Sequence, residues 1–204
     1  TLFWFFGING PAVTNTIFSP IHKVLTVENY EAAKAGLEMT NIFTAGFSDF
    51  FCNFGGGGST LGLVIMMAFV AKSNRLKTLG RLSLPAGIFG INEPIIFGLP
   101  IVLNPLMAIP FILTPVVNTI IGYVATITHI IPITNGTQLP WTTPILFSGW
   151  LVTGTFMGSL VQLVQLAVDI AIYYPFFRML DKKYLEEETT NAGQTDELDD
   201  LSFD

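Results

Sequence analysis

One long stretch of this chain carries almost no charge, and this feature limits the fold more than any other. Between Arg81 and Arg178 the charged side chains are Glu93 and Asp169. The whole chain is 50% hydrophobic and 12% charged, whereas a soluble domain carries about 25% charged residues. Repeated apolar runs are typical of membrane-spanning helices, which satisfy their own backbone polar groups in lipid. We therefore predict an all-α integral membrane protein.

The acidic residues gather at the carboxyl end of the chain. Eight of the 15 Asp and Glu residues lie between Tyr184 and Asp204, in a segment without Lys or Arg. We predict that residues 184–204 form a disordered, solvated tail. Without this tail the chain is slightly basic, and it has no basic stripe, so no nucleic-acid partner is expected.

Basic residues cluster beside two of the apolar runs. Cytoplasmic loops of membrane proteins carry an excess of Lys and Arg. We therefore expect both clusters, and with them the carboxyl terminus, on the cytoplasmic side of a multi-pass protein. The clusters consist of Lys72, Arg75, Lys77 and Arg81, and of Arg178, Lys182 and Lys183.

Gly and Pro interrupt the apolar runs, which predicts broken and re-entrant helices. Residues 1–21 predict a transmembrane helix broken near its middle. Because the chain starts inside this run, we expect a carboxyl-terminal part whose upstream spans are missing. Aromatic residues, four glycines and a short apolar run at 42–72 predict a re-entrant hairpin followed by a short helix. The other predicted segments are a loop with an amphipathic helix at 22–41, an interrupted apolar segment at 84–103, a span at 105–128, a polar stretch at 129–144 and a long helix at 145–177.

A short repeat joins two of the interrupted segments. Residues 6–11 (FGINGP) match residues 89–94 (FGINEP) at five of six positions. Paired helix interruptions form the binding sites of many transporters. The alternative is coincidence in an apolar sequence of low diversity.

Glu93 is the sharpest candidate for a functional residue. A carboxylate within an apolar segment costs on the order of 3 kcal/mol at a helix centre unless a cavity or a partner receives it. Gly90 and Pro94 break the helix around it and predict such a cavity, where a sugar hydroxyl is a suitable partner. The structural alternative is a helix cap or an ion pair. For Asp169, pairing with a basic residue near the cytoplasmic end is as plausible as a function.

The remaining candidates are less specific. Trp141 lies in a polar, Pro-rich stretch, where it suits either stacking on a sugar ring or a membrane interface. Residues 55–58 are four glycines without the Lys-Ser/Thr of a P-loop, which favours close backbone packing over a phosphate site. Cys52 is alone, so neither an intrachain disulfide nor a metal site or cofactor is expected. His22 and His129 are isolated.

The motif at residues 90–100 (GINEPIIFGLP) is long and specific. It resembles the enzyme IIC membrane component of bacterial phosphoenolpyruvate-dependent sugar phosphotransferase systems, in the lactose/cellobiose/diacetylchitobiose group. Residues 4–8, 53–59 and 139–141 also look like that family, and the likeness extends through residues 1–183. The resemblance implies a homodimer with re-entrant hairpins, whose carboxyl-terminal half is the sugar-binding transport domain. Residues 1–183 look like that half.

The resemblance also implies roles for four residues. Glu93 matches the family's sugar-binding Glu, a possible general base for the C6 hydroxyl of the sugar. Asn92 matches its neighbouring ligand, and Trp141 matches an aromatic residue beside the sugar. Asn9 falls where several relatives carry a His; an Asn side chain hydrogen-bonds a hydroxyl but cannot take a proton.

The implied function is that of a sugar permease in the bacterial cell membrane. It binds a disaccharide of the cellobiose, diacetylchitobiose or lactose type and moves it by alternating access. A separate enzyme IIB, supplied by enzyme IIA and the phosphocarrier protein, then phosphorylates C6 from its own Cys, which is not Cys52. Whether the chain counts as an enzyme therefore depends on its partner. The alternative is an ion-coupled secondary sugar transporter without phosphotransfer, which broken helices and an intramembrane acid suit as well.

Overall fold

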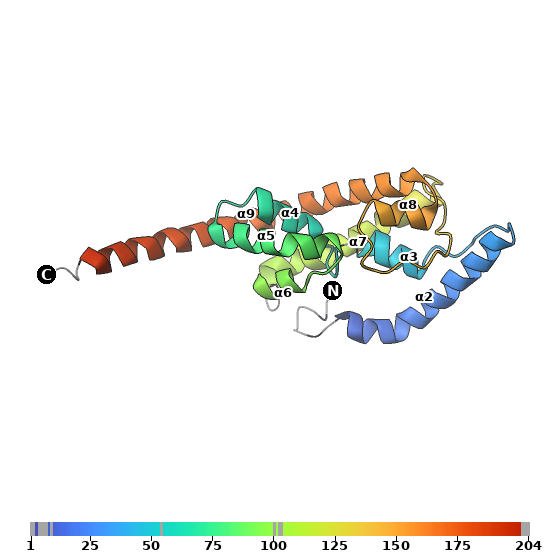
Figure 1. Ribbon diagram of the computed structural model, residues 1–204, viewed down its shortest axis with the longest axis horizontal. Helices are drawn as coiled ribbons and strands as arrows, with labels where there is room; N and C mark the ends of the chain where they lie inside the picture. The colour runs from blue at the N-terminus through green and yellow to red at the C-terminus, as the bar shows by residue number, and fades with distance from the viewer. Residues whose placement is uncertain are drawn as a thin grey trace.

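The computed structural model describes residues 3, 8, 10–53, 55–99, 101 and 104–200, and within these residues every regular element is a helix. The predicted all-α class is confirmed. In Figure 1 the longest helix, α9, runs along the molecule and the shorter helices gather along part of its length. The elements are α2 (Gly10–Lys34), α3 (Ala45–Phe47), the π-helix η1 (Ser48–Cys52), α4 (Leu61–Phe69), α5 (Asn74–Ile88), α6 (Glu93–Gly98), α7 (Pro105–Ile127), α8 (Phe147–Thr153) and α9 (Phe156–Asp200).

Two of the described helices are long and apolar enough to cross a membrane. They are α7 and the part of α9 from Phe156 to Thr190. The α7 helix begins at Pro105, where a proline fits because the first helical N–H has no partner, and the Asn104 side chain accepts from Leu106 N at 3.1 Å. A helix thus covers the span predicted at 105–128, with its bounds matching within one residue.

Residues 45–53 and 55–69 form a hairpin whose second arm is the short helix that was predicted to follow it. A short helical arm, α3 and η1, leads into the glycine turns at 55–60, and α4 returns from them. A π-helix leaves backbone carbonyls without their usual partners, and buried carbonyls require a donor. Two α9 side chains supply donors: the Gln162 amide donates to Phe50 O and the Gln165 amide to Phe51 O, each at 2.8 Å.

Two apolar clusters hold the described helices together. The first joins α4, α5, α6 and α7 to α9 around Leu63, Met67, Ile95, Phe111 and Tyr173. The second joins α3 and η1 to α7, α8 and α9 around Phe47, Phe51, Ala125, Val152 and Val161. The hairpin therefore lies between both clusters, with α9 as the common support.

The segment 84–103 is interrupted as predicted, whereas the segment 145–177 is not one helix. The α8 helix ends at Thr153, because Gly154 takes φ +70°, and α9 starts at Phe156. The two helices contact each other where Gly158 packs against the backbone of Gly149. This close contact requires glycine at positions 149 and 158. In the sequence, these are two glycines in an otherwise apolar run.

The prediction for residues 22–41 is wrong in its boundary. The α2 helix continues from Gly10 to Lys34 through Pro20 and ends near Gly36, whose φ is +67°. Many of its apolar side chains are exposed, and in Figure 1 α2 lies apart from the other helices over most of its length. The break predicted within residues 1–21 falls mostly outside the described residues.

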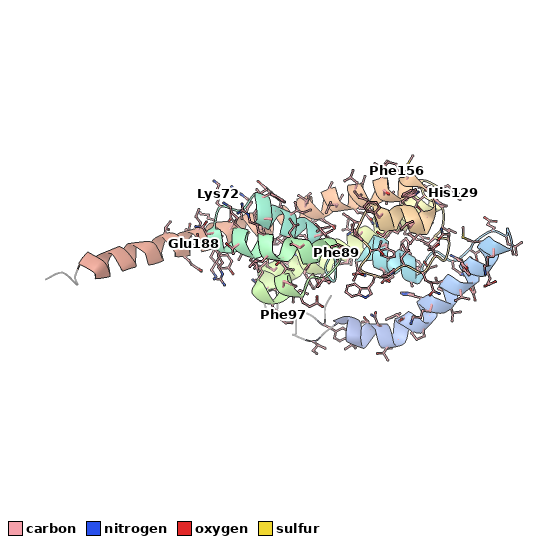
Figure 2. The ribbon with its side chains drawn as sticks, viewed as in Figure 1. Lys72, Phe89, Phe97, His129, Phe156 and Glu188 are labelled. Carbon is pink, nitrogen blue, oxygen red and sulfur yellow. The ribbon has the colours of Figure 1, made fainter. Side chains whose placement is uncertain are left out.

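Helix α9 continues to Asp200, where the sequence predicts a disordered tail. Two exposed pairs one turn apart favour the helix, Lys182–Glu186 at 3.6 Å and Lys183–Glu187 at 3.9 Å. Glu188 also accepts from the backbone N–H groups of Asn74 and Arg75, which places it at the amino end of α5. Figure 2 shows Lys72 and Glu188 near one another, where α9 leaves the other helices.

Candidate functional site

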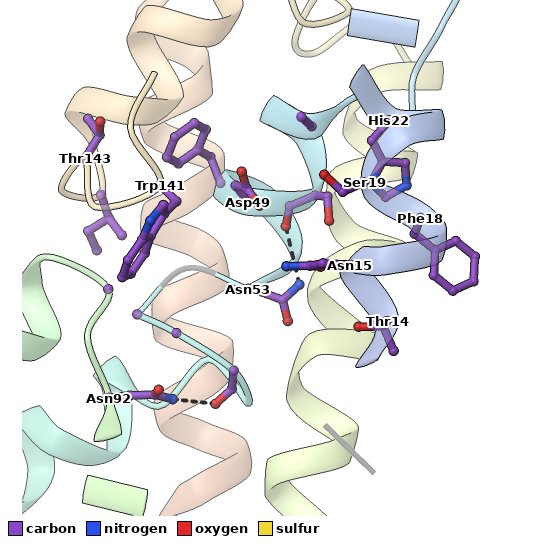
Figure 3. Close-up of a pocket in the computed structure, with 18 of the residues that line it drawn as sticks. Thr14, Asn15, Phe18, Ser19, His22, Asp49, Asn53, Asn92, Trp141 and Thr143 are labelled. Atoms are coloured by element: carbon purple, nitrogen blue, oxygen red, sulfur yellow. Dashed lines mark hydrogen bonds between the residues drawn. The ribbon is translucent and has the colours of Figure 1, made fainter. Parts of the chain in front are cut away.

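A cavity of about 560 Å³ lies between α2, the hairpin, the break between α5 and α6, and the loop before α8. Figure 3 shows α2 on one side of it and Trp141 and Asn92 on the other. Three of the four predicted site residues, Asn92, Glu93 and Trp141, line this cavity. The fourth, Asn9, lies outside the described residues.

The break between α5 and α6 positions Asn92 and Glu93. Gly90 takes φ +78°, which a residue with a side chain rarely adopts, and it turns the chain after α5. Asn92 then precedes the first turn of α6, where its carbonyl accepts from Ile95 N and Ile96 N at 3.0 Å. Glu93 and Pro94 open the helix, the place where a proline is tolerated and an acid is favoured.

Asn92 joins this break to the glycine loop of the hairpin. Its side-chain amide donates to Gly57 O at 2.6 Å and to Thr60 Oγ1 at 3.3 Å, and the residue is 6% exposed. Both amide hydrogens are therefore engaged, which leaves Oδ1 as the atom that can accept a hydrogen bond from a ligand. The close packing predicted for the four glycines is present, because a Cβ on Gly56 would lie 2.7 Å from both Oδ1 and Nδ2 of Asn92.

The Glu93 side chain is exposed to the cavity. Within the described residues no hydrogen bond or ion pair to its carboxylate is recorded. Among the described residues, neither a hydrogen bond of a helix cap nor an ion pair therefore engages this carboxylate. A carboxylate with free acceptor sites in a polar cavity is suited to accept hydrogen bonds from ligand hydroxyl groups.

Trp141 places an aromatic ring beside these two residues. Trp141 is 59% exposed and lies close to Gly90. A Cβ atom added to Gly90 would be 3.5 Å from the Trp141 carbonyl oxygen and 3.8 Å from the Trp141 ring. The ring therefore flanks the helix break at the cavity wall, as Figure 3 shows. An exposed indole face beside acceptor oxygens fits a ligand with both apolar faces and hydroxyl edges.

Sequence reasoning missed several polar side chains of this cavity. Asp49 and Asn53 come from the hairpin, and Asn15 and His22 from α2. The signal for Asp49 was an acid inside an aromatic stretch, comparable to the signal for Glu93. No such signal marks Asn15 or Asn53. His22 lines the cavity although nothing in its sequence neighbourhood marked it as a site residue.

The described residues hold no group of three or more His, Cys, Asp or Glu side chains that could bind a metal ion. Cys52 is 8% exposed and belongs to the second apolar cluster, as expected for a small buried residue. Asp169 is fully buried and pairs with neither Arg178 nor Lys182 among the described contacts, so ion pairing at the cytoplasmic end does not explain it.

An all-helical fold with broken helices around a polar cavity is the arrangement in which many membrane transporters bind their substrates. The family model described as "Phosphotransferase system, EIIC" matches residues 1–115, more than half of the chain. The chain belongs to this family, whose members are integral membrane proteins of bacteria, and its predicted family is therefore confirmed.

Two curated relatives and one solved structure show how far the similarity extends. The chain is 43% identical over 188 residues to the lichenan permease IIC component of Bacillus subtilis (strain 168), covering 92% of this chain and 42% of the relative. It is 43% identical over 206 residues to the cellobiose-specific EIIC component of Geobacillus stearothermophilus, covering 97% and 46%. The crystal structure of ChbC, the IIC component of an N,N'-diacetylchitobiose-specific phosphotransferase system, matches with a TM-score of 0.90 at 44% identity, covering 92% and 44%. The chain thus spans less than half the length of each.

Proposed function

We propose that this chain is the sugar-binding transport domain of a phosphotransferase-system permease, with residues 1–183 as that domain. The observation that carries the proposal is the convergence of Asn92, Glu93 and Trp141 on one cavity in an EIIC family member. Two of the relatives named above are components of systems specific for cellobiose and for N,N'-diacetylchitobiose. A disaccharide of the cellobiose, diacetylchitobiose or lactose type is the proposed substrate.

Glu93 binds the sugar through hydroxyl groups and is the proposed general base for the C6 hydroxyl. Its side chain is exposed and lines the cavity, and no hydrogen bond from a described residue to it is recorded, which supports a role in binding substrate hydroxyls. A base within hydrogen-bond reach of a hydroxyl makes it a better nucleophile. Phosphoryl transfer from a good donor depends chiefly on positioning, so Glu93 also contributes by holding C6 in place.

Asn92 and Trp141 orient the sugar in this proposal. Asn92 accepts a hydroxyl hydrogen at Oδ1, since its amide hydrogens hold the glycine loop. Trp141 covers one face of a sugar ring with its exposed indole. Asn9 is a further proposed ligand, one that can hydrogen-bond but cannot exchange a proton.

The proposed partners follow from the phosphotransferase system. Enzyme IIB donates the phosphoryl group from its Cys to C6 at the cytoplasmic side, and enzyme IIA and the phosphocarrier protein supply it. The full-length protein is proposed to be a homodimer that alternates access across the lipid bilayer. The basic clusters at 72–81 and 178–183 support a cytoplasmic carboxyl terminus.

The test uses the full-length protein in inverted membrane vesicles, with Glu93→Gln as the informative variant. We expect the wild-type protein to yield sugar phosphorylated at C6 only when phosphoenolpyruvate and the enzyme IIB chain of donors are present. The variant should still bind sugar within a few-fold of the wild-type affinity but lose phosphorylation. Equal loss of sugar binding and of phosphorylation would contradict the role of Glu93 as a base. Uptake of unmodified sugar on an ion gradient would contradict the proposal that the protein is a phosphotransferase-system permease.

A further inference from the structure

Four polar side chains form a buried stripe on one face of α9. Gln162, Gln165, Asp169 and Tyr173 follow at helical spacing, and each is 0% exposed. Three of them bind backbone carbonyls of the hairpin, since Tyr173 donates to Gly58 O at 2.6 Å and the two Gln amides donate as described above. Asp169 cannot act in this way, because a carboxylate has no hydrogen to donate.

Among the described residues, Asp169 receives hydrogen bonds from one recorded group. The Asn118 amide on α7 donates to its Oδ1 at 2.9 Å and its Oδ2 at 3.2 Å. The ion pairs recorded within the described residues are both between positions 182 and 187, so none reaches this carboxylate. A charged group within the membrane region without a cationic partner points to a function.

Asp181 on the same helix shows what a satisfied buried carboxylate looks like in this protein. It is 3% exposed and receives backbone N–H bonds from Lys72 at 3.0 and 3.1 Å and from Ser73 at 2.9 Å. Two backbone N–H groups at the amino end of α5 therefore donate hydrogen bonds to the Asp181 carboxylate. Asp169, three turns away, has no comparable set of donors among the described residues.

Two amide oxygens, on residues that contact Asp169 or lie one turn from it, have no hydrogen-bond donor among the described residues. Asn118 Oδ1 and Gln165 Oε1 are buried, and the described residues give neither a partner. Both belong to the surroundings of Asp169: Asn118 binds it directly, and Gln165 lies one turn away on α9 and donates to Asn118 O at 2.8 Å. Buried oxygens are costly without a partner. A proton on Asp169 supplies one donor, whereas a cation satisfies several oxygens at once.

The cluster also lies at the unwound part of the hairpin. Ser59, with φ +49°, accepts from the Asn118 amide at 3.3 Å and donates to Cys52 O at 3.1 Å, at the carboxyl end of η1. In transporters, unwound backbone and the carboxyl ends of broken helices are where sodium ions are coordinated. A single positive charge would neutralise the single negative charge of Asp169.

We propose that Asp169, Asn118 Oδ1 and Gln165 Oε1 form a binding site for one sodium ion, separate from the sugar cavity. Neither Asp169 nor these two amides lines that cavity. Bound sodium would fix α7 and α9 against the hairpin, whose glycine loop Asn92 holds from the other side. The inference does not depend on the proposed sugar or on phosphotransfer, because it concerns only these buried oxygens.

The experiment measures sodium binding to the full-length protein in detergent. Equilibrium binding of ²²Na⁺ gives stoichiometry, and the thermal unfolding midpoint is followed while NaCl replaces choline chloride at constant ionic strength. Any ion that binds the folded state alone raises this midpoint in a saturable way. We expect one sodium per protomer and a saturable rise for the wild-type protein. Asp169→Asn should abolish both, whereas Asp181→Asn, the matched control, should retain both.

Each result of the sodium-binding experiment either supports or contradicts the proposed sodium site. Absence of saturable ²²Na⁺ binding to the wild-type protein would overturn it, and would favour a proton or a buried water at Asp169. Retention of binding by Asp169→Asn, or its loss in Asp181→Asn alone, would place the ion elsewhere. If Asp169→Asn does not fold, Asp169→Glu, which keeps the charge but moves the carboxylate, should weaken sodium affinity at least tenfold. An unchanged affinity would also contradict the site.

Discussion

Gly56 offers the sharpest test of how the hairpin supports the sugar cavity. It takes φ +89°, and a methyl group at this position would lie 2.7 Å from both polar atoms of the Asn92 amide. Gly56→Ala should therefore push Asn92 out of its place. The same change should break the amide's bonds to Gly57 O and Thr60 Oγ1, which fix where Oδ1 points.

The expected magnitude has two parts. A left-handed backbone costs an alanine about 1–2 kcal/mol. Each of the two lost hydrogen bonds contributes about 1 kcal/mol, so the protein should be destabilised by roughly 3–4 kcal/mol in all. Loss of one sugar contact at Asn92 Oδ1, about 1.4 kcal/mol, corresponds to a roughly tenfold weaker sugar affinity.

The control for Gly56→Ala is Gly36→Ala. Gly36 takes φ +67°, and a methyl group there would meet nothing within 4 Å, so this variant bears the backbone strain without the collision. Sugar affinity is measured by titration calorimetry on full-length proteins, with the unfolding midpoint as the second readout. We expect Gly36→Ala to bind sugar normally. If Gly56→Ala binds as tightly as Gly36→Ala, the proposed role of Asn92 is refuted.

Three further predictions concern stability and the site. Tyr173→Phe leaves Gly58 O without its donor in a buried position and should lower the free energy of unfolding by about 1–3 kcal/mol, measured by thermal or chemical unfolding. Trp141→Ala removes the exposed ring from the cavity wall and should weaken sugar affinity roughly 3- to 10-fold in the same calorimetric assay. Gly158→Ala places a methyl group against the backbone of Gly149 and should separate α8 from α9, with a large fall in the unfolding midpoint.

Each of these variants has a matched control. Tyr174→Phe changes the neighbouring tyrosine, which is 48% exposed, and should leave stability unchanged. Trp150→Ala removes a 51% exposed indole outside the cavity and should not alter sugar affinity. Gly46→Ala adds a methyl group at an ordinary 3.5 Å contact with Val152. If a control variant loses as much stability or sugar affinity as the variant it is matched with, the role assigned to the corresponding contact is contradicted.

The fold class and the centre of the site were predictable because they depend on local sequence. The charge-free stretch indicated membrane helices, and the Gly and Pro residues around Glu93 indicated the helix break that exposes it. The break at Gly154 was not predicted, since a glycine in an apolar run fits both a helix interior and a left-handed terminus. The length of α2 was missed because its polar carboxyl part suggested a loop.

The other side of the cavity could not be predicted from single segments. Asn15, Asp49 and Asn53 reach it because α2 and the hairpin come together in space, and no short motif encodes that approach. The environment of Asp169 likewise depends on tertiary contacts. The sequence suggested an ion pair with a nearby basic residue, whereas in the fold the Asn118 amide donates to Asp169, and the amide oxygens of Asn118 and Gln165 have no partner among the described residues.

The most direct test of the proposed site is a structure of the full-length protein with a bound disaccharide of the cellobiose type. We expect the sugar in the cavity between α2, the hairpin and the break before α6. Its C6 hydroxyl should lie within hydrogen-bond distance of the Glu93 carboxylate, one hydroxyl should donate to Asn92 Oδ1, and one ring face should lie against Trp141. A sugar bound outside this cavity, or with C6 turned away from Glu93, would contradict the site assigned to this protein.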